Sequence, residues 1–295
     1  MFQSLKLGKF FGIDLYVHGT FWLLPLFVLL SGVMSGDPLA AIGGEIAFIF
    51  AVFGCVVLHE VGHALAARAY GIGTRDITLY PVGGVASLER MPEKPGREIA
   101  IALAGPLVNV VIAAALFAGL LGQSLLNPWA AVATGPGAID LFAAKLLWAN
   151  VILAVFNMLP AFPMDGGRVL RALLAIRMPR VRATEVAVGV GMVVAAVFFL
   201  GGLYLGHFGL MAVAVVVYLL GQAELAAVRA RAVAREWGER AGWYAPADDA
   251  DAPAADDPGA PPVGRGFTGL VWNEARGVWV QYENGHVVRV IDPTT

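Results

Sequence analysis

The feature that most constrains this chain is a set of long stretches without any charged residue. They contain 22, 41, 19 and 38 residues and lie between Asp14 and Asp37, Glu98 and Asp140, Lys145 and Asp165, and Glu185 and Glu224. A helix that crosses a membrane needs about 20 mostly apolar residues. Only 14% of the chain is charged, whereas an average soluble domain has about 25%. The windows therefore predict a membrane protein with several spans.

We expect six spans. A further apolar run extends from Glu45 to Ala67, and the 41-residue window supplies one span near 99–121 before a loop. The last window is too long for one helix, and a turn within it is predicted by four closely spaced glycines, Gly201, Gly202, Gly206 and Gly209. The expected fold class is an all-α polytopic membrane protein with six transmembrane helices.

Basic residues predict the orientation of these spans. Several arginines or lysines precede the first span and follow the second, fourth and sixth, whereas the three opposite loops, near 35–44, 122–138 and 203–208, carry none. The positive-inside rule then places both termini in the cytosol, with the chain in the cell (inner or plasma) membrane. We expect the arginines after Gly167 to face phospholipid headgroups.

Two segments outside the spans predict β structure. Short apolar strands at 77–80 and 85–88 flank Pro81-Val82-Gly83-Gly84, which is typical of a hairpin. The expected domains are a membrane core at 1–222, a cytosolic helix at 223–243, an acidic Ala/Pro linker at 244–264 and a β module of three short strands at 265–295. The net charge of −2 does not indicate the basic surface that binding to a nucleic acid needs.

The sharpest chemical signal is His59-Glu60-Val61-Gly62-His63, an H-E-x-x-H pattern within the second apolar run. Residues four apart lie on one face of a helix, so both imidazoles can bind one zinc ion. Glu60 is then suited to take a proton from a water that the metal activates. The alternative is that the histidines only pack between helices. Three ionisable residues in an apolar span are costly, which favours the functional interpretation.

A catalytic zinc site uses three protein ligands. His18, His207 and His286 are poorly placed for this, and Asp165 is a better candidate because the predicted topology puts it on the same side as His59 and His63. The alternative is that Asp165 caps a helix over 166–176. Spacing alone leaves both alternatives open.

Taken together, these motifs resemble the site-2 protease family of intramembrane zinc metalloproteases. The resemblance rests on H-E-x-x-H, on N-x-x-P-x-x-P-x-D-G-G-R at 157–168, and on the A-G-P-x-x-N stretch at 104–109. It implies one Zn²⁺ per chain, held by His59, His63 and Asp165, with Glu60 as catalytic base. It also implies hydrolysis of a peptide bond in or near the transmembrane segment of a single-span substrate. No PDZ or CBS domain is apparent.

The resemblance also suggests where a substrate would bind. Asn150 and Asn157 lie seven residues apart on one helix face, and the alternative for them is hydrogen bonding between helices. The strand edge that includes Gly83 and Gly84 is suited to hold an extended substrate as an added strand.

Two other functions remain to be weighed, a metal-binding membrane transporter and a catalytically inactive homologue. A transporter is disfavoured by the lack of internal repeats, and an inactive homologue by the complete motif. The other expected partners are the lipid bilayer and, for the apolar β module, either the entrance of the active site or a second copy in a homo-oligomer.

Overall fold

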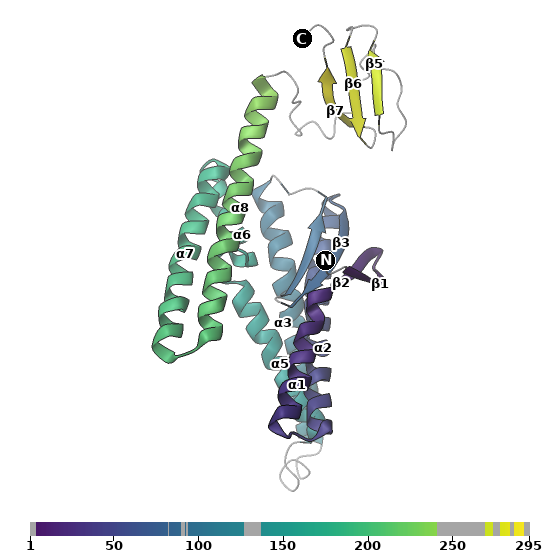
Figure 1. Cartoon of the computed structure of the whole chain (residues 1–295), viewed down its shortest axis with the longest axis vertical. Helices are drawn as coiled ribbons and strands as arrows, with labels where there is room; N and C mark the ends of the chain where they lie inside the picture. Colours follow the sequence, from purple (N-terminus) through teal and green to yellow (C-terminus); the bar gives the residue numbers. More distant parts are fainter. Residues whose placement is uncertain are drawn as a thin grey trace. The chain divides into compact units, whose positions relative to one another are not determined.

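The computed structural model describes residues 4–81, 83–89, 92, 94–126, 137–240, 269–273, 278–283 and 286–291 (Figure 1). The chain divides into two compact units, Met1–Ala226 and Ala227–Thr295. The first unit carries the helices and the sheet that build the candidate site.

Five helices in the described part of the chain are long and apolar enough to cross a membrane. They are α2 (Leu39–Ala69), α3 (Pro95–Leu126), α5 (Ala138–Asn157), α7 (Arg180–Leu205) and the part of α8 (Phe208–Arg240) that covers Phe208–Val233. A sixth apolar segment, Gly19–Ser35, is shorter and consists of a 3-10 turn, η1 (Gly19–Trp22), and α1 (Leu23–Ser35). The expected count of six spans is therefore not confirmed, whereas a helical protein with several spans is.

The first apolar window is shortened because its beginning forms a strand. Strand β2 (Ile13–His18) pairs antiparallel with β1 (Ser4–Phe10), and neither strand was predicted from the sequence. Ile13 and Val17 point into the core while the residues between them are less buried. An apolar window counts only composition, so it does not separate a strand from a helix.

Strands β1 to β4 form a sheet in the order β1-β2-β3-β4 (Figure 1). The predicted hairpin is present as β3 (Thr74–Tyr80) and β4 (Gly83–Leu88), an antiparallel pair, and β3 runs parallel to β2. The sheet packs against α2 through two apolar clusters, Ile13, Val61, Ala64 and Ile77, and Val17, Phe21, Phe53 and Leu79. Strand β4 is thus an edge strand that lies on the helix carrying His59-Glu60-Val61-Gly62-His63.

The fourth span lies further toward the N-terminus than predicted. Helix α5 begins at Ala138, and Asp140 in its first turn accepts a hydrogen bond from the Gly137 amide at 3.0 Å. The charge of Lys145 does not bound the span because its ammonium pairs with Glu45 of α2 at 2.8 Å. After α5 the chain is irregular until α6 (Asp165–Ala175).

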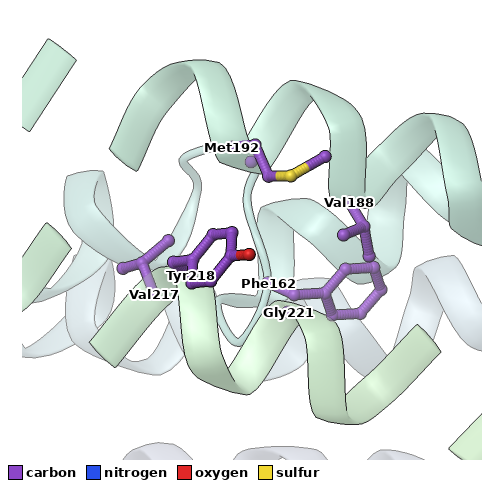
Figure 2. Close-up of a pocket in the computed structure, with 7 residues that line it drawn as sticks. Phe162, Val188, Met192, Val217, Tyr218 and Gly221 are labelled. Carbon is purple, nitrogen blue, oxygen red and sulfur yellow. The ribbon is translucent and has the colours of Figure 1, made fainter. Parts of the chain in front are cut away.

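The last two helices of the first unit are joined as predicted. Helix α7 ends in a turn at Gly206, whose φ of 69° is a left-handed conformation that suits glycine. Phe162, from the segment before α6, is buried against Val188 of α7 and Leu225 of α8, in the small apolar pocket between these helices (Figure 2). Helix α8 continues without a break through the point where a cytosolic helix was expected to begin.

In the second unit, three strands form an antiparallel sheet in the order β5-β6-β7. They are β5 (Gly269–Asn273), β6 (Val278–Glu283) and β7 (His286–Ile291). Trp272 and Trp279 are cross-strand partners with ring centroids 5.3 Å apart. Val280 and Tyr282, on the other face, are buried.

Candidate metal centre

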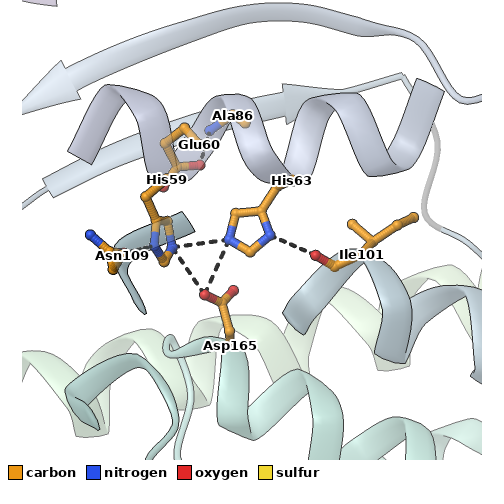
Figure 3. Close-up of polar contacts among 7 residues, drawn as sticks. All are labelled: His59, Glu60, His63, Ala86, Ile101, Asn109 and Asp165. Carbon is orange, nitrogen blue, oxygen red and sulfur yellow. Dashed lines mark hydrogen bonds and ion pairs between the residues drawn. The ribbon is translucent and has the colours of Figure 1, made fainter. Parts of the chain in front are cut away.

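Two helices that are far apart in the sequence bring three ligand-type atoms together. The Nε2 atoms of His59 and His63, one turn apart on α2, are 3.0 Å from each other. Each also lies 3.1 Å from Oδ2 of Asp165, the first residue of α6 (Figure 3). All three residues are buried, and among the described residues they form the one group of this kind that could hold a metal ion.

The Nδ1 atoms of His59 and His63 make hydrogen bonds that determine how each ring is oriented toward Asp165. His63 Nδ1 lies 2.7 Å from the carbonyl oxygen of Ile101, which only accepts, so Nδ1 donates there. His59 Nδ1 donates to Asn109 Oδ1 at 2.5 Å, and Asn109 is oriented by donating from Nδ2 to Asn150 Oδ1 at 2.8 Å. Both Nε2 lone pairs are thereby directed toward Asp165, as is usual for histidines that bind a metal.

The electrostatics of this arrangement favour a cation. Two lone pairs and a carboxylate oxygen within 4.8 Å of one another repel unless positive charge lies between them. Two histidines and one carboxylate are a ligand set that catalytic zinc uses with one position left open, so the residues fit zinc.

The geometry also bears on the two alternatives for Asp165. The residue at the N-cap of α6 is Met164, and no side chain caps the helix there. The Asp165 carboxylate contacts the histidines instead. This arrangement favours a ligand over a helix cap.

Helix α3 passes close to the imidazoles because Gly105 has no side chain. A Cβ at this position would overlap the His63 ring and lie 2.6 Å from His59 Nε2. Ile101 and Asn109, which hold the two rings, are on the same helix. The A-G-P-x-x-N stretch thus provides both the space for the histidines and part of their support.

A model described as peptidase family M50 matches residues 47–135 and 130–200, more than half of the chain and the part that contains the candidate centre. The chain belongs to peptidase family M50. This confirms the resemblance to site-2 proteases that the sequence motifs indicated.

Individual relatives of this M50 chain support the assignment. It is 33% identical to a zinc metalloprotease of Methanocaldococcus jannaschii over 224 residues, 76% of this chain and 61% of the relative. A Synechocystis relative is 35% identical over 182 residues, 59% of this chain and 45% of the relative. The chain thus spans between about half and three fifths of the length of these curated relatives. A solved site-2 protease from Methanocaldococcus jannaschii matches with a TM-score of 0.57 and 30% identity, over 76% of this chain and 95% of that chain.

The edge of the sheet in this M50 chain lies against the predicted base. Glu60 Oε2 accepts a hydrogen bond from the Ala86 amide of β4 at 3.2 Å (Figure 3). A Cβ at Gly84 would lie 2.8 Å from Glu60 Cγ and 3.2 Å from Val56 Cγ1. Gly84 therefore permits the close approach of strand and helix, and its neighbour Gly83, at φ 143°, starts the strand.

The two asparagines singled out in α5 differ in their surroundings. Asn150 is fully buried, and its Nδ2 donates to Leu146 O at 2.9 Å and to Cys55 Sγ at 3.3 Å while its Oδ1 accepts from Asn109. The bonds to Asn109 of α3 and Cys55 of α2 are the interhelical bonds that the sequence left as the alternative to a substrate contact, whereas the bond to Leu146 lies within α5. Asn157, the last residue of α5, is half-buried.

The expectation that the arginines after Gly167 face lipid headgroups is wrong for Arg171. This residue is 1% exposed, and its side chain is paired with Glu98 of α3 and Glu224 of α8. The sequence pattern shows only that basic residues follow the span, and it does not identify acidic partners that lie 73 and 53 residues away.

Proposed function

We propose that this M50 chain is an intramembrane zinc metalloprotease that hydrolyses a peptide bond in or near the transmembrane segment of a single-span membrane protein. The observation that carries this proposal is the convergence of His59 Nε2, His63 Nε2 and Asp165 Oδ2 beside Glu60. One Zn²⁺ per chain would be held by these three atoms. The membership of family M50 and the zinc metalloproteases among its relatives support the same activity.

The residues of the chain then have separate tasks. When bound, zinc would polarise the scissile carbonyl and lower the pKa of water. Glu60 takes the proton from that water at its carboxylate and delivers it to the leaving amine. The Ala86 amide orients the Glu60 carboxylate, and Asn109 and the Ile101 carbonyl keep the histidine rings in position.

A substrate helix must unwind before its peptide bonds can be cleaved, and its freed backbone groups then need hydrogen-bond partners in the membrane. The outer edge of β4 supplies such partners beside Glu60, so we place the extended substrate along Gly83 and Gly84 as an added strand. Asn157 would contact the substrate, whereas Asn150 supports His59 through Asn109.

We further propose that the chain lies in the cell membrane with both termini in the cytosol. The five apolar helices support a multi-pass protein. The arginines after α2 and around α6 and the lack of basic residues in the opposite loops support this orientation. The candidate centre would then lie toward the cytosolic side.

Purified full-length chain in detergent tests the proposal. We expect about one zinc per chain and cleavage of a single-span reporter within or next to its apolar segment. A strong chelator should abolish cleavage, and Zn²⁺, but not Mg²⁺, should restore it, because histidine ligands suit zinc. If the protein bound zinc stoichiometrically but cleaved none of a panel of single-span reporters, the proposed protease activity would be wrong. The result would support the metal site alone.

Replacing Gly84 by valine should impair the proposed base, Glu60, without changing metal binding. The added side chain would push Glu60 away from its position, and a displacement of about 1 Å at a reacting group can cost roughly 10²-fold in rate. We expect cleavage to fall by about that factor with unchanged zinc content. Val85→Ile, at the exposed neighbour on β4, is the control and should cleave normally. Normal cleavage by Gly84→Val would show that the position of Glu60 does not limit the reaction.

A further inference from the structure

Four charged side chains form a cluster that joins four helices within the first unit. Arg171 of α6 donates from Nε and Nη2 to Glu98 Oε1 of α3, at 2.8 and 2.5 Å, and from Nη1 to Glu224 Oε1 of α8 at 2.5 Å. Arg180 of α7 approaches Glu98 Oε2 at 3.1 Å. Two positive and two negative groups balance each other.

The central pair of the cluster, Arg171 and Glu98, lies in the interior. Arg171 is 1% and Glu98 4% exposed. The guanidinium carbon of Arg171 also lies 5.0 Å from the ring centroid of Phe162, the residue packed between α7 and α8. Apolar residues of equal volume often stabilise an interior as well as a buried ion pair does. Stability alone is therefore a weak reason for placing these charges here.

The same two helices hold the two sides of the metal centre. On α3, Glu98 lies one turn before Ile101, whose carbonyl accepts from His63. On α6, Arg171 lies six residues after Asp165, about 9 Å along the helix. The three contacts link the same elements in a ring. His63 of α2 bonds to the Ile101 carbonyl of α3, and Glu98 of α3 pairs with Arg171 of α6. Asp165 of α6 in turn contacts His63.

We propose that Arg171 is a positioning residue, which fixes α6 against α3 and thereby sets where the Asp165 carboxylate stands relative to the two imidazoles. This inference rests on the proposed metal site. Arginine suits the task because one planar guanidinium reaches both Glu98 and Glu224. The ammonium of lysine keeps the charge but does not reproduce this fork.

Metal affinity tests the inference directly. Full-length protein in detergent is titrated with Co²⁺ against a competing chelator, with the visible spectrum as a report on ligand geometry. We expect Arg171→Met and Glu98→Gln each to weaken Co²⁺ binding by up to about 10- to 100-fold, the effect of removing a group that bonds directly to a metal ligand. Arg171→Lys should retain part of the affinity, and the double variant should bind no more weakly than the worse single variant.

Arg177→Met is the matched control, because Arg177 is an exposed arginine just beyond α6. It should bind Co²⁺ like the original chain. Melting temperatures of the metal-free proteins are measured in parallel, so that a loss of stability is separated from a loss of affinity. Glu98→Gln changes no volume and Arg171→Lys keeps the charge, so they carry the test if Arg171→Met does not fold.

Unchanged Co²⁺ affinity and spectrum in Arg171→Lys and Glu98→Gln, with or without a lower melting temperature, would overturn the positioning role. Failure of the original chain itself to bind Co²⁺ or Zn²⁺ would instead overturn the proposed metal site. The two failures are thus distinguishable in one titration series.

Discussion

Replacement of Glu60 by glutamine is expected to lower cleavage of a single-span reporter by about 10²- to 10⁴-fold, the contribution of a general base. Glutamine keeps the size of the side chain and an oxygen that can accept from the Ala86 amide. It does not take up a proton at that oxygen. Zinc content and the melting temperature should stay close to those of the original chain, so the loss is measured as turnover per bound zinc.

Glu45→Gln is the matched control for this change. Glu45 is on the same helix, but it is exposed and pairs with Lys145. Glu45 lies 14 residues before His59 on α2, about 21 Å along the helix, so its replacement should leave turnover per bound zinc unchanged. If zinc-loaded Glu60→Gln cleaved at the original rate, Glu60 would not be the base, and another proton acceptor would have to be sought.

Replacement of Asp165 by alanine should remove the metal and, with it, the activity. The variant takes away the carboxylate oxygen 3.1 Å from both Nε2 atoms and leaves two histidines, which is one ligand short of a catalytic zinc site. We expect zinc per chain to fall well below one after dialysis against a weak chelator. Metal analysis of the purified protein measures this outcome.

Asp140→Ala provides the comparison, because Asp140 accepts a backbone bond at the start of α5. Loss of such a bond costs about 1 kcal/mol of the free energy of unfolding and should leave zinc unchanged. If Asp165→Ala behaved like Asp140→Ala, with full zinc and slightly lower stability, Asp165 would be a helix-terminal residue and not a ligand.

The parts of this fold that the sequence predicts are those that depend on local composition. The apolar run that includes His59 forms α2, and the glycines near Gly206 form the turn between α7 and α8. The N-terminal strands were missed because apolar windows count only composition, and because β2 also pairs with a strand that is distant in the sequence. Asp14 of β2 pairs in register with Asp76 of β3, and no local pattern indicates that pairing.

In the candidate site, too, local spacing predicts some residues, whereas others depend on tertiary contacts. The spacing of His59 and His63 places both on one helix face, so the pair can be read from the sequence. For Asp165, spacing left ligand and cap equally open, and tertiary contacts were needed to favour one. Arg171 was misinterpreted because the sequence pattern of a basic segment after a span is the same whether an arginine faces lipid or is buried. Only its partners, on α3 and α8, distinguish them.

The three proposed ligands come from positions separated by 102 and 106 residues. An ion bound by all three would close a large loop of the folded chain and would have no comparable site in the unfolded chain. A ligand that binds only the folded state adds about 4 kcal/mol to the free energy of unfolding when its free concentration is 1,000 times its Kd. The lifetime of this protein in a cell would then depend on the zinc supply as well as on its own sequence.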